Sequence, residues 1–364
     1  MQNTPLNDIH KGLDARMGPF GGFRMPIQYE GILAEHRAAR QEAALFDTCH
    51  MGEVRLSGAT ALRDLENLVT CPVASLAQGK CRYGLMCNEK GGVLDDLLVY
   101  RESENSFMIV VNAGTQDRDV QWMRDHTGAD TRVDNLSGEL GKVDLQGPRA
   151  PRIMQTLIDD PIDDMTFYSF RHCAYRGSHI LLSRTGYTGE IGFEFYGSAE
   201  LVCQFWQDCM DRGATPAGLG ARDTLRLEMG MPLYGHELTE NRNAAETGFS
   251  RPIARDKTFI GSAAVHGETN AEQRLVGITF EGRRAAREGT ELSSVDGTPV
   301  GTVTSGSFGP SVGTALALAY IDKAEARIGR RVRAAARRRT LEGTVTSLPF
   351  YTDGTARRAM HRFL

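Results

Sequence analysis

The feature that most constrains this chain is a pair of adjacent acids inside an otherwise apolar strand. The segment reads Gly91-Gly92-Val93-Leu94-Asp95-Asp96-Leu97-Leu98-Val99-Tyr100. Because side chains alternate along a strand, Asp96 shares a face with Leu98 and Tyr100, whereas Asp95 points to the opposite face. A carboxylate in apolar surroundings needs a partner, a raised pKa or a function. The two acids therefore do not form a dyad, and we expect the chemistry to lie in this segment.

A second apolar strand, Phe107 to Asn112, follows a polar turn centred on Glu104, and the two strands form a predicted hairpin. The predicted cross-strand pairs are Asp96 with Asn112, Leu98 with Val110, and Tyr100 with Met108. One face of the hairpin then combines a carboxylate, a carboxamide and a phenol among aliphatic side chains, which is typical of a small-molecule site. In the alternative interpretation, the two acids only satisfy backbone groups beside the Gly-Gly turn.

Length and composition limit the class of protein. A chain of 364 residues exceeds one hydrophobic core, so two or three domains are expected. The net charge of -4 carries no nucleic-acid signature, and no apolar run approaches the roughly 20 residues of a membrane span. We therefore expect neither a nucleic-acid partner nor a membrane partner.

The cysteines and histidines predict neither a disulfide framework nor a metal site. The seven cysteines contain no Cys-x-x-Cys pair, and the nine histidines form no closely spaced ligand group. His50, beside Cys49, is interpreted as a packed residue. The first residues lack the basic start and the apolar core of a targeting peptide. We expect reduced thiols, no metal and a cytoplasmic protein.

The order of predicted elements indicates an α+β core followed by a small barrel. Helices and strands alternate without a regular βαβ repeat. The predicted helices cover residues 31–45, 60–69, 116–124, 198–210 and 221–229, with one more after Pro148, and further strands cover 141–145, 179–183 and 191–196. Beyond Arg274, short strands at 276–280, 298–304, 315–321 and 344–348 are typical of an antiparallel barrel. The polar segment 265–274 marks the boundary.

A second candidate motif is the loop and strand from Gly186 to Glu194. Glu190, Gly192 and Glu194 alternate on one face, where the small residue leaves space for a flat ligand. The Glu194 carboxylate can accept two parallel N–H bonds from the ring amidine of a pterin or a purine, and Arg222 can orient that carboxylate. The alternatives are an exposed acidic face for Glu194 and a surface helix charge for Arg222.

The C-terminal region carries a basic patch. Its members are Arg327, Arg330, Arg331, Arg333, Arg337, Arg338, Arg339, Arg357, Arg358 and Arg362. The aromatic platforms of a single-strand nucleic-acid binder are missing around them. Two interpretations stay open, namely a solvated barrel face and a docking surface for an acidic protein.

Taken together, these segments resemble the aminomethyltransferase, or T protein, of the glycine cleavage system, and the similarity extends over nearly the whole chain. The motifs that carry it are Thr4-Pro5-Leu6, Met25-Pro26-Ile27-Gln28-Tyr29, Leu45-Phe46-Asp47, His50-Met51-Gly52-Glu53, Tyr83, Leu85-Met86, Gly91 to Asp96, Val111-Asn112-Ala113, Leu145-Gln146-Gly147-Pro148, Gly186 to Glu190, Ala221-Arg222-Asp223, Leu225 to Glu228, Leu233-Tyr234-Gly235 and Gly301 to Gly306. Their order and spacing are more specific than any single fragment.

The resemblance implies a three-domain, ring-like fold with two interleaved α+β domains and a C-terminal antiparallel β-barrel. On this division the first domain takes residues 1–50 and 140–265, the second takes 51–139 with the Asp96 hairpin, and the barrel takes 274–364. Tetrahydrofolate is expected in a central cavity. The essential aspartate of the family corresponds to Asp96, and the folate contacts carry over to Met51, Tyr83, Tyr100, Val110, Asn112, Tyr187, Glu194 and Arg222.

The resemblance also implies the reaction and its partners. The family transfers an aminomethyl group from the lipoyl arm of a small carrier, the lipoylated H protein, to tetrahydrofolate. The products are ammonia, 5,10-methylenetetrahydrofolate and the dihydrolipoyl carrier. An anion such as Asp96 near the reacting nitrogen would stabilise developing positive charge.

The sequence departs from the family pattern in one loop. Gly248-Phe249-Ser250-Arg251-Pro252 stands where a Trp is common, and Ala244-Ala245-Glu246 stands where Pro-Leu-Glu is usual. These changes keep open an alternative, a folate-dependent demethylase or methyltransferase that acts on a free methylated amine or a sulfonium compound. An accessory protein for iron–sulfur cluster maintenance is disfavoured, because its Lys-Gly-Cys-Tyr-x-Gly-Gln-Glu signature is absent and Asp96 is present.

Overall fold

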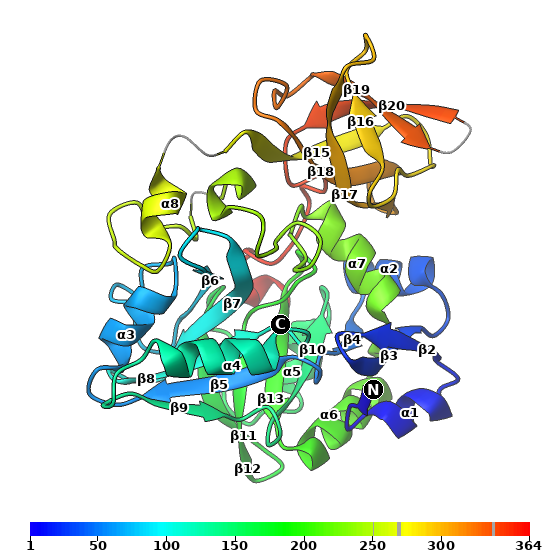
Figure 1. Ribbon diagram of the computed structural model, residues 1–364. Coiled ribbons are helices and arrows are strands. Elements are labelled where there is room, and N and C mark those ends of the chain that lie inside the picture. The colour runs from blue at the N-terminus through cyan, green and yellow to red at the C-terminus, as the bar shows by residue number, and fades with distance from the viewer. Residues whose placement is uncertain (250, 268–270, 337–338) are drawn as a thin grey trace. The chain divides into compact units, whose positions relative to one another are not determined.

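The chain forms two compact units with an α+β composition. The structure, a computed structural model, describes residues 1–249, 251–267, 271–336 and 339–364. The first unit takes residues 1–84, 97–222 and 354–364, and the second takes residues 85–96 and 223–353. The predicted α+β class and the C-terminal antiparallel barrel are confirmed (Figure 1). The three-domain division and its boundaries stay a prediction.

The helices are short. They are α1 (Asn7–Gly12), α2 (Ile32–Gln41), α3 (Ala61–Leu68), α4 (Gln116–Asp125), α5 (Ala150–Gln155), α6 (Ala199–Asp211), α7 (Leu219–Glu228) and α8 (Ser262–His266), with 3-10 turns at Ala244–Thr247 and Met360–Arg362. The six helices predicted from apolar periodicity are confirmed. The first of them ends earlier than expected, because Ala44–Asp47 forms a fully buried strand, β4. No helix within the described ranges is long and apolar enough to cross a membrane.

A six-stranded sheet organises the first unit. Its order is β11 (Phe170–Tyr175), β12 (Ser178–Ser183), β13 (Gly192–Gly197), β10 (Gly141–Gln146), β4 (Ala44–Asp47) and β14 (Thr215–Ala217). Helix α6 packs its apolar face on this sheet, and the rings of Phe195 and Phe205 stack at 4.1 Å. Strands β10 and β13 are antiparallel neighbours in which Asp144 lies opposite Glu194 and Lys142 lies opposite Tyr196. Polar side chains of the two central strands are therefore held side by side.

The hairpin with the two acids belongs to a five-stranded sheet. Its order is β6 (Cys81–Cys87), β7 (Val93–Arg101), β8 (Ser106–Val111), β5 (Gly52–Ser57) and β9 (Arg132–Asn135). Two of the predicted cross-strand pairs are confirmed, Leu98 with Val110 and Tyr100 with Met108. The pairing of Asp96 with Asn112 lies beyond the recorded register of β7 and β8, and it stays a prediction.

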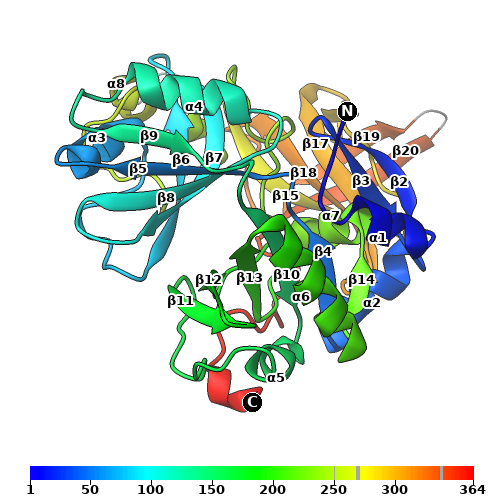
Figure 2. The same ribbon diagram turned by 90° about the horizontal axis from the view of Figure 1, so that it is seen from below.

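The two sheets share an apolar cluster within the first unit. Tyr100, Met108 and Val110 from the five-stranded sheet pack with Phe170 and Tyr196 from the six-stranded sheet. The unit also contains a small sheet of β1 (Gln2–Asn3), β3 (Phe23–Gln28) and β2 (Arg16–Phe20), visible at the blue end of the chain in Figure 2. The cluster brings one face of the predicted hairpin against the strand that carries Glu194.

The second unit is built around a closed six-stranded barrel. Its order is β15 (Gln273–Phe280), β18 (Thr314–Asp322), β17 (Pro299–Gly309), β16 (Glu291–Ser293), β19 (Arg331–Ala336) and β20 (Arg339–Thr346). Strands β15, β17, β18 and β20 were predicted, whereas β16 is too short and β19 too rich in arginine to give a strand pattern. The Gly-Gly turn before β7 packs in this unit, where a Cβ on Gly92 would lie 1.8 Å from the carbonyl oxygen of Glu240. Glycine is therefore required there for close packing.

Candidate active site

Three buried charges on the central strands of the six-stranded sheet, Lys142, Asp144 and Glu194, form a chain with the partly buried Arg222. The Lys142 ammonium lies 2.7 Å from Oδ1 of Asp144 and 2.9 Å from Oε1 of Glu194. Nη1 of Arg222, from α7, donates to Oδ2 of Asp144 at 2.8 Å. Positive and negative groups thus alternate, and each carboxylate contacts at least one cation.

These pairings hold Asp144 and Lys142 in their charged forms. Burial opposes ionisation of Asp144, but Lys142 and Arg222 outweigh it and hold the pKa of Asp144 below its usual range. Burial likewise opposes charge on Lys142, but Asp144 and Glu194 raise its pKa above the usual value. The set is formally neutral, which is how charges are tolerated in a sheet core.

The second oxygen of Glu194 collects hydroxyl donors. Oε2 accepts from Tyr100 at 3.1 Å, from Tyr196 at 2.9 Å and from Thr185 at 2.8 Å. Burial raises the pKa of both tyrosines well above the usual value, so their hydroxyl groups keep their protons. The hydrogen bond between Tyr100 and Glu194 joins the two sheets and brings together two residues that the sequence singled out separately.

The loop before β13 positions Tyr187. Thr188 donates to Oε1 of the buried Gln146 at 3.0 Å, and Arg40 forms an ion pair with Glu190 at 2.8 Å. The guanidinium of Arg222 lies 4.9 Å from the centre of the Tyr187 ring, within the range of a cation–π contact. The loop therefore fixes Tyr187 and Arg222 as a pair.

Two details of the predicted ligand face are wrong. The space beside Gly192 holds the Gln146 side chain, since a Cβ on Gly192 would lie 2.7 Å from the amide carbon of Gln146. Arg222 pairs with Asp144, and the cation that contacts Glu194 is Lys142. Glycine at this position serves close packing, and the carboxylate is oriented by a residue that sequence reasoning missed.

The signal for the missed pair is present in the sequence. Lys142 and Asp144 stand two residues apart in a strand whose every residue is buried, so both side chains occupy one face. Opposite charges on one face of a fully buried strand indicate a buried ion pair. Their contact with Glu194 depends on the pairing of β10 with β13, which alternation along one strand does not reveal.

The remaining predicted residues lie on or beside the five-stranded sheet. On β7, Asp95 is fully buried and Asp96 is half-buried, as expected for neighbours on opposite faces. Tyr83 on β6 and Asn112 just after β8 are also half-buried. Met51, before β5, packs against the shared apolar cluster and brings its sulfur to 3.9 Å from the Lys142 ammonium.

His50 and the cysteines have structural environments. Burial lowers the pKa of His50 to about 4, and its ring meets Phe20 edge-on with centroids 5.4 Å apart. All seven cysteines are free thiols. Among the residues that the structure describes, no group of three or more His, Cys, Asp or Glu side chains is arranged to hold a metal ion.

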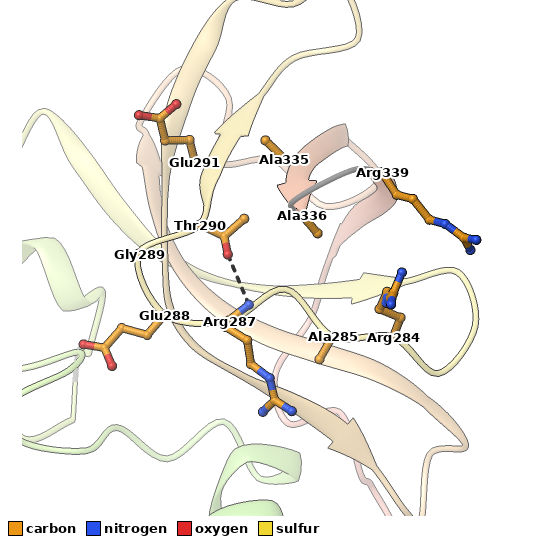
Figure 3. Close-up of a pocket in the computed structure, with 10 residues that line it drawn as sticks. All are labelled: Arg284, Ala285, Arg287, Glu288, Gly289, Thr290, Glu291, Ala335, Ala336 and Arg339. Atoms are coloured by element: carbon orange, nitrogen blue, oxygen red, sulfur yellow. Dashed lines mark hydrogen bonds between the residues drawn. The ribbon is translucent and has the colours of Figure 1, made fainter.

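The barrel carries a separate open pocket of about 1160 Å³, shown in Figure 3. Among the residues that the structure describes, the cations that line it are Arg284, Arg287 and Arg339, which we call the pocket arginines. Arg287 also donates to the carbonyl oxygen of Gly306 at 3.1 Å. In Figure 3, Arg284 and Arg339 lie on one side of the pocket, and Glu288 and Glu291 lie on the other.

The basic patch predicted from the sequence is partly neutralised. Arg330, Arg331 and Arg333, which we call the paired arginines, each contact a barrel glutamate. Arg333 lies opposite Glu342 on β20 and contacts it at 2.9 Å. Arg337 and Arg338 lie outside the described residues. Arg331 and Arg333 thus form cross-strand ion pairs with Glu342 on a solvated barrel face.

Comparison with known proteins finds two family domains along this chain. Residues 6–257 match the GCVT N-terminal domain, and residues 273–352 match the glycine cleavage T-protein C-terminal barrel domain. An aminomethyltransferase of Halothermothrix orenii is 40% identical over 357 residues, which cover 96% of this chain and 100% of that protein. One from Chloroherpeton thalassium is 39% identical, covering 96% and 99%. The crystal structure of the glycine cleavage system aminomethyltransferase T from Bartonella henselae aligns with a TM-score of 0.92 at 30% identity, covering 97% and 99%.

Proposed function

Because this chain belongs to the glycine cleavage T-protein family, we propose that it moves an aminomethyl unit from a lipoylated H protein to tetrahydrofolate. It is a transferase enzyme, an aminomethyltransferase. The finer assignments, tetrahydrofolate as co-substrate, the H protein as partner and the cytoplasm as location, follow from family membership and remain part of the proposal. No metal is assigned a role.

The observation that supports folate binding most directly is the hydrogen bond between Tyr100 and Glu194. A reduced pterin presents a ring amidine and a flat apolar surface, and this region offers a carboxylate, phenol groups and an aromatic ring under a guanidinium. We assign Glu194 to the amidine edge and the Tyr187–Arg222 pair to the ring or its substituent. Tyr83, Val110, Asn112 and Met51 complete the proposed contacts.

Both oxygens of Glu194 already accept hydrogen bonds within the protein. A ligand N–H group therefore competes with hydroxyl donors, above all Tyr100, which can turn toward Tyr196 because the two hydroxyl oxygens lie 3.0 Å apart. Such an exchange keeps Tyr100, Tyr196 and Glu194 hydrogen-bonded. We propose that Tyr100 gives up its hydrogen bond to Glu194 when folate binds.

Asp96 is the proposed catalytic residue. The bond between the transferred carbon and its amine nitrogen breaks, the lipoyl sulfur leaves, and the two folate nitrogens each exchange an N–H bond for a bond to that carbon. The two protons released from folate end on ammonia and on the lipoyl sulfur, so atoms and charge balance. A half-buried carboxylate near the carbon stabilises the positive charge that develops there.

The test is turnover with two kinds of donor. The protein is incubated with tetrahydrofolate and either an aminomethylated lipoyl carrier or free methylated amines and sulfonium compounds, and methylenetetrahydrofolate and ammonia are measured. We expect both products when the aminomethylated carrier is the donor, and neither product with the free donors. Product from the free donors, with none from the carrier, would favour the demethylase or methyltransferase alternative.

A further inference from the structure

Glu53 is a buried acid beside the candidate site that the chemistry above does not use. It lies on β5 in register with Val110 of β8, and Val110 pairs in turn with Leu98 of β7. Residues opposite one another in a sheet present their side chains on the same face, so Glu53 projects from the face that carries Tyr100. Only 1% of its surface is exposed.

Buried carboxyl groups normally form hydrogen bonds, and the carboxyl group of Glu53 is an exception. Within the part of the chain that the structure describes, neither carboxyl oxygen has a hydrogen-bond partner. The backbone N–H group of Glu53 is satisfied, because it donates to the hydroxyl of Ser137 at 3.0 Å. An ionised carboxylate in this position would pay a large desolvation penalty, so the neutral acid is the form that the fold accommodates.

Titratable groups from three directions surround this carboxyl. They are Lys142 on β10, Glu194 and Tyr196 on β13, and Cys49 in the turn before β5. Burial raises the pKa of Glu53 to about 8, Lys142 opposes the increase and Glu194 adds to it. Glu53 therefore carries a proton at neutral pH and loses it in mildly alkaline solution.

We propose that Glu53 is a positioning residue of the folate site. Its proton keeps the Lys142 ammonium in contact with the carboxylate of Glu194. This inference rests on the proposed function, because Glu194 is the residue assigned to the pterin. With Glu53 neutral, Lys142 holds Oε1 of Glu194 at 2.9 Å. Once ionised, Glu53 competes for the same ammonium and draws it away from Glu194. The affinity for reduced folate then falls as Glu53 loses its proton.

The first experiment measures the dissociation constant of 5-methyltetrahydrofolate, a chemically stable reduced folate, by calorimetry between about pH 6 and about pH 9. The variants are Glu53→Gln, which keeps the shape but does not ionise, and Glu139→Gln, which removes an exposed acid of the same unit. We expect the dissociation constant to rise severalfold across this range in the wild type and in Glu139→Gln, and to stay level in Glu53→Gln. A parallel rise in Glu53→Gln, or no rise in the wild type, would overturn the proposal.

The second experiment does not depend on folate. Difference infrared spectra recorded during a pH titration should show the carbonyl band of a protonated carboxylic acid disappearing near pH 8 in the wild type, and no such band in Glu53→Gln. If the wild type binds folate without showing the band, the role of Glu53 is overturned while the proposed function stands. If the band is present but no reduced folate binds, the proposed function fails and the positioning role falls with it.

Discussion

At the scale of single residues, the candidate site depends on charges that would be costly if they stood alone. Lys142 is tolerated in a sheet core because two carboxylate oxygens lie 2.7 and 2.9 Å from its ammonium. Asp144 is shared between Lys142 and Arg222, so it stays paired when either neighbour turns to a ligand. Glu194 therefore is the member of the chain whose charge can be removed with the least disturbance to the others.

Replacing Glu194 by Gln should weaken tetrahydrofolate binding by about 1 to 3 kcal/mol, the range for a buried hydrogen bond to a charged group. Lys142 keeps Asp144 as its partner in this variant, so the fold should persist. Calorimetry measures the affinity, and circular dichroism checks the fold. The control is Glu200→Gln on the exposed surface of α6, which should bind folate like the wild type. Unchanged affinity in Glu194→Gln would leave the pterin contact without its main residue.

Replacing Glu53 by Gln should change how stability depends on pH. An unfolded glutamate titrates near its ordinary pKa of 4.5, whereas the folded pKa is about 8. Between these pH values the folded state holds a proton that the unfolded state has released. The free energy of unfolding of the wild type therefore falls by about 1.4 kcal/mol per pH unit in this window, or about 3 kcal/mol by pH 7. Glu53→Gln should lack this decline.

Urea denaturation at several pH values compares the two proteins. Their stabilities should agree below the unfolded pKa, where Glu53 is protonated in both states, and the variant should be the more stable at neutral pH. A constant difference across the whole range would mean that folding does not raise the pKa of Glu53.

At the scale of elements, strand β7 shows how far alternation can be taken. The apolar run and the polar turn after it are local features, so the hairpin and the Leu98–Val110 register could be predicted from them. The barrel strand β19 could not, because Arg331 and Arg333 read as part of a charge run. In the structure they alternate with Val332 and Ala334, which are fully buried in the barrel.

The candidate site likewise has features that the local sequence predicts and features that depend on strand pairing. The predicted importance of Glu194 rested on a local motif and on resemblance, whereas its contact with Lys142 requires two strands that are about fifty residues apart to pair, which no local pattern encodes. The carboxyl of Glu53 was passed over for a related reason. Its significance lies in the absence of a hydrogen-bond partner among the described residues, and that is a property of the packed structure.

The alternation on β7 leads to a comparison of two adjacent substitutions. Asp96→Asn removes the charge of the half-buried acid while keeping its shape, and we expect a large loss of turnover with folate affinity roughly preserved. Asp95→Asn changes the fully buried neighbour on the opposite face and should cost far less activity. Steady-state kinetics and calorimetry on both variants, with thermal unfolding to monitor the fold, provide the measurement. The reverse ranking of activity would show that Asp95, and not Asp96, faces the reaction.

At the scale of the whole molecule, the two units are each assembled from segments distant in the chain. Residues 354–364 belong with the first unit, where Ile191 donates to the hydroxyl of Thr355 at 2.9 Å and Arg184 donates to the carbonyl oxygen of Ala356 at 3.2 Å. Met360 of this segment is buried in the core of the first unit, and a composition shift along the sequence does not reveal such a return. The barrel, in contrast, is one continuous run of short strands and could be recognised from its pattern.

The last prediction concerns where the acidic carrier docks. The paired arginines already contact carboxylates, so their guanidinium groups are less available to an acidic partner. The pocket arginines line an open depression of about 1160 Å³ and are the better candidates for attracting an acidic protein. Two triple variants to Gln, one of each set, remove the same charge from the same barrel. They separate a specific docking surface from a general loss of positive charge.

Replacing the pocket arginines should raise the KM for the lipoyl carrier and flatten its dependence on salt, while the affinity for folate stays the same. The reason is that steering by exposed charges fades as salt shortens the Debye length from about 10 Å at 0.1 M to about 3 Å at 1 M. Replacing the paired arginines should change the KM much less, because their guanidinium groups are held against glutamates and do not line the pocket. Carrier kinetics at low and high salt, with thermal unfolding as a check on the barrel, distinguish the two sets. Equal effects of both variants would mean that the pocket arginines act only as part of a uniformly basic surface. Wild-type behaviour of both variants would mean that the carrier docks away from these arginines.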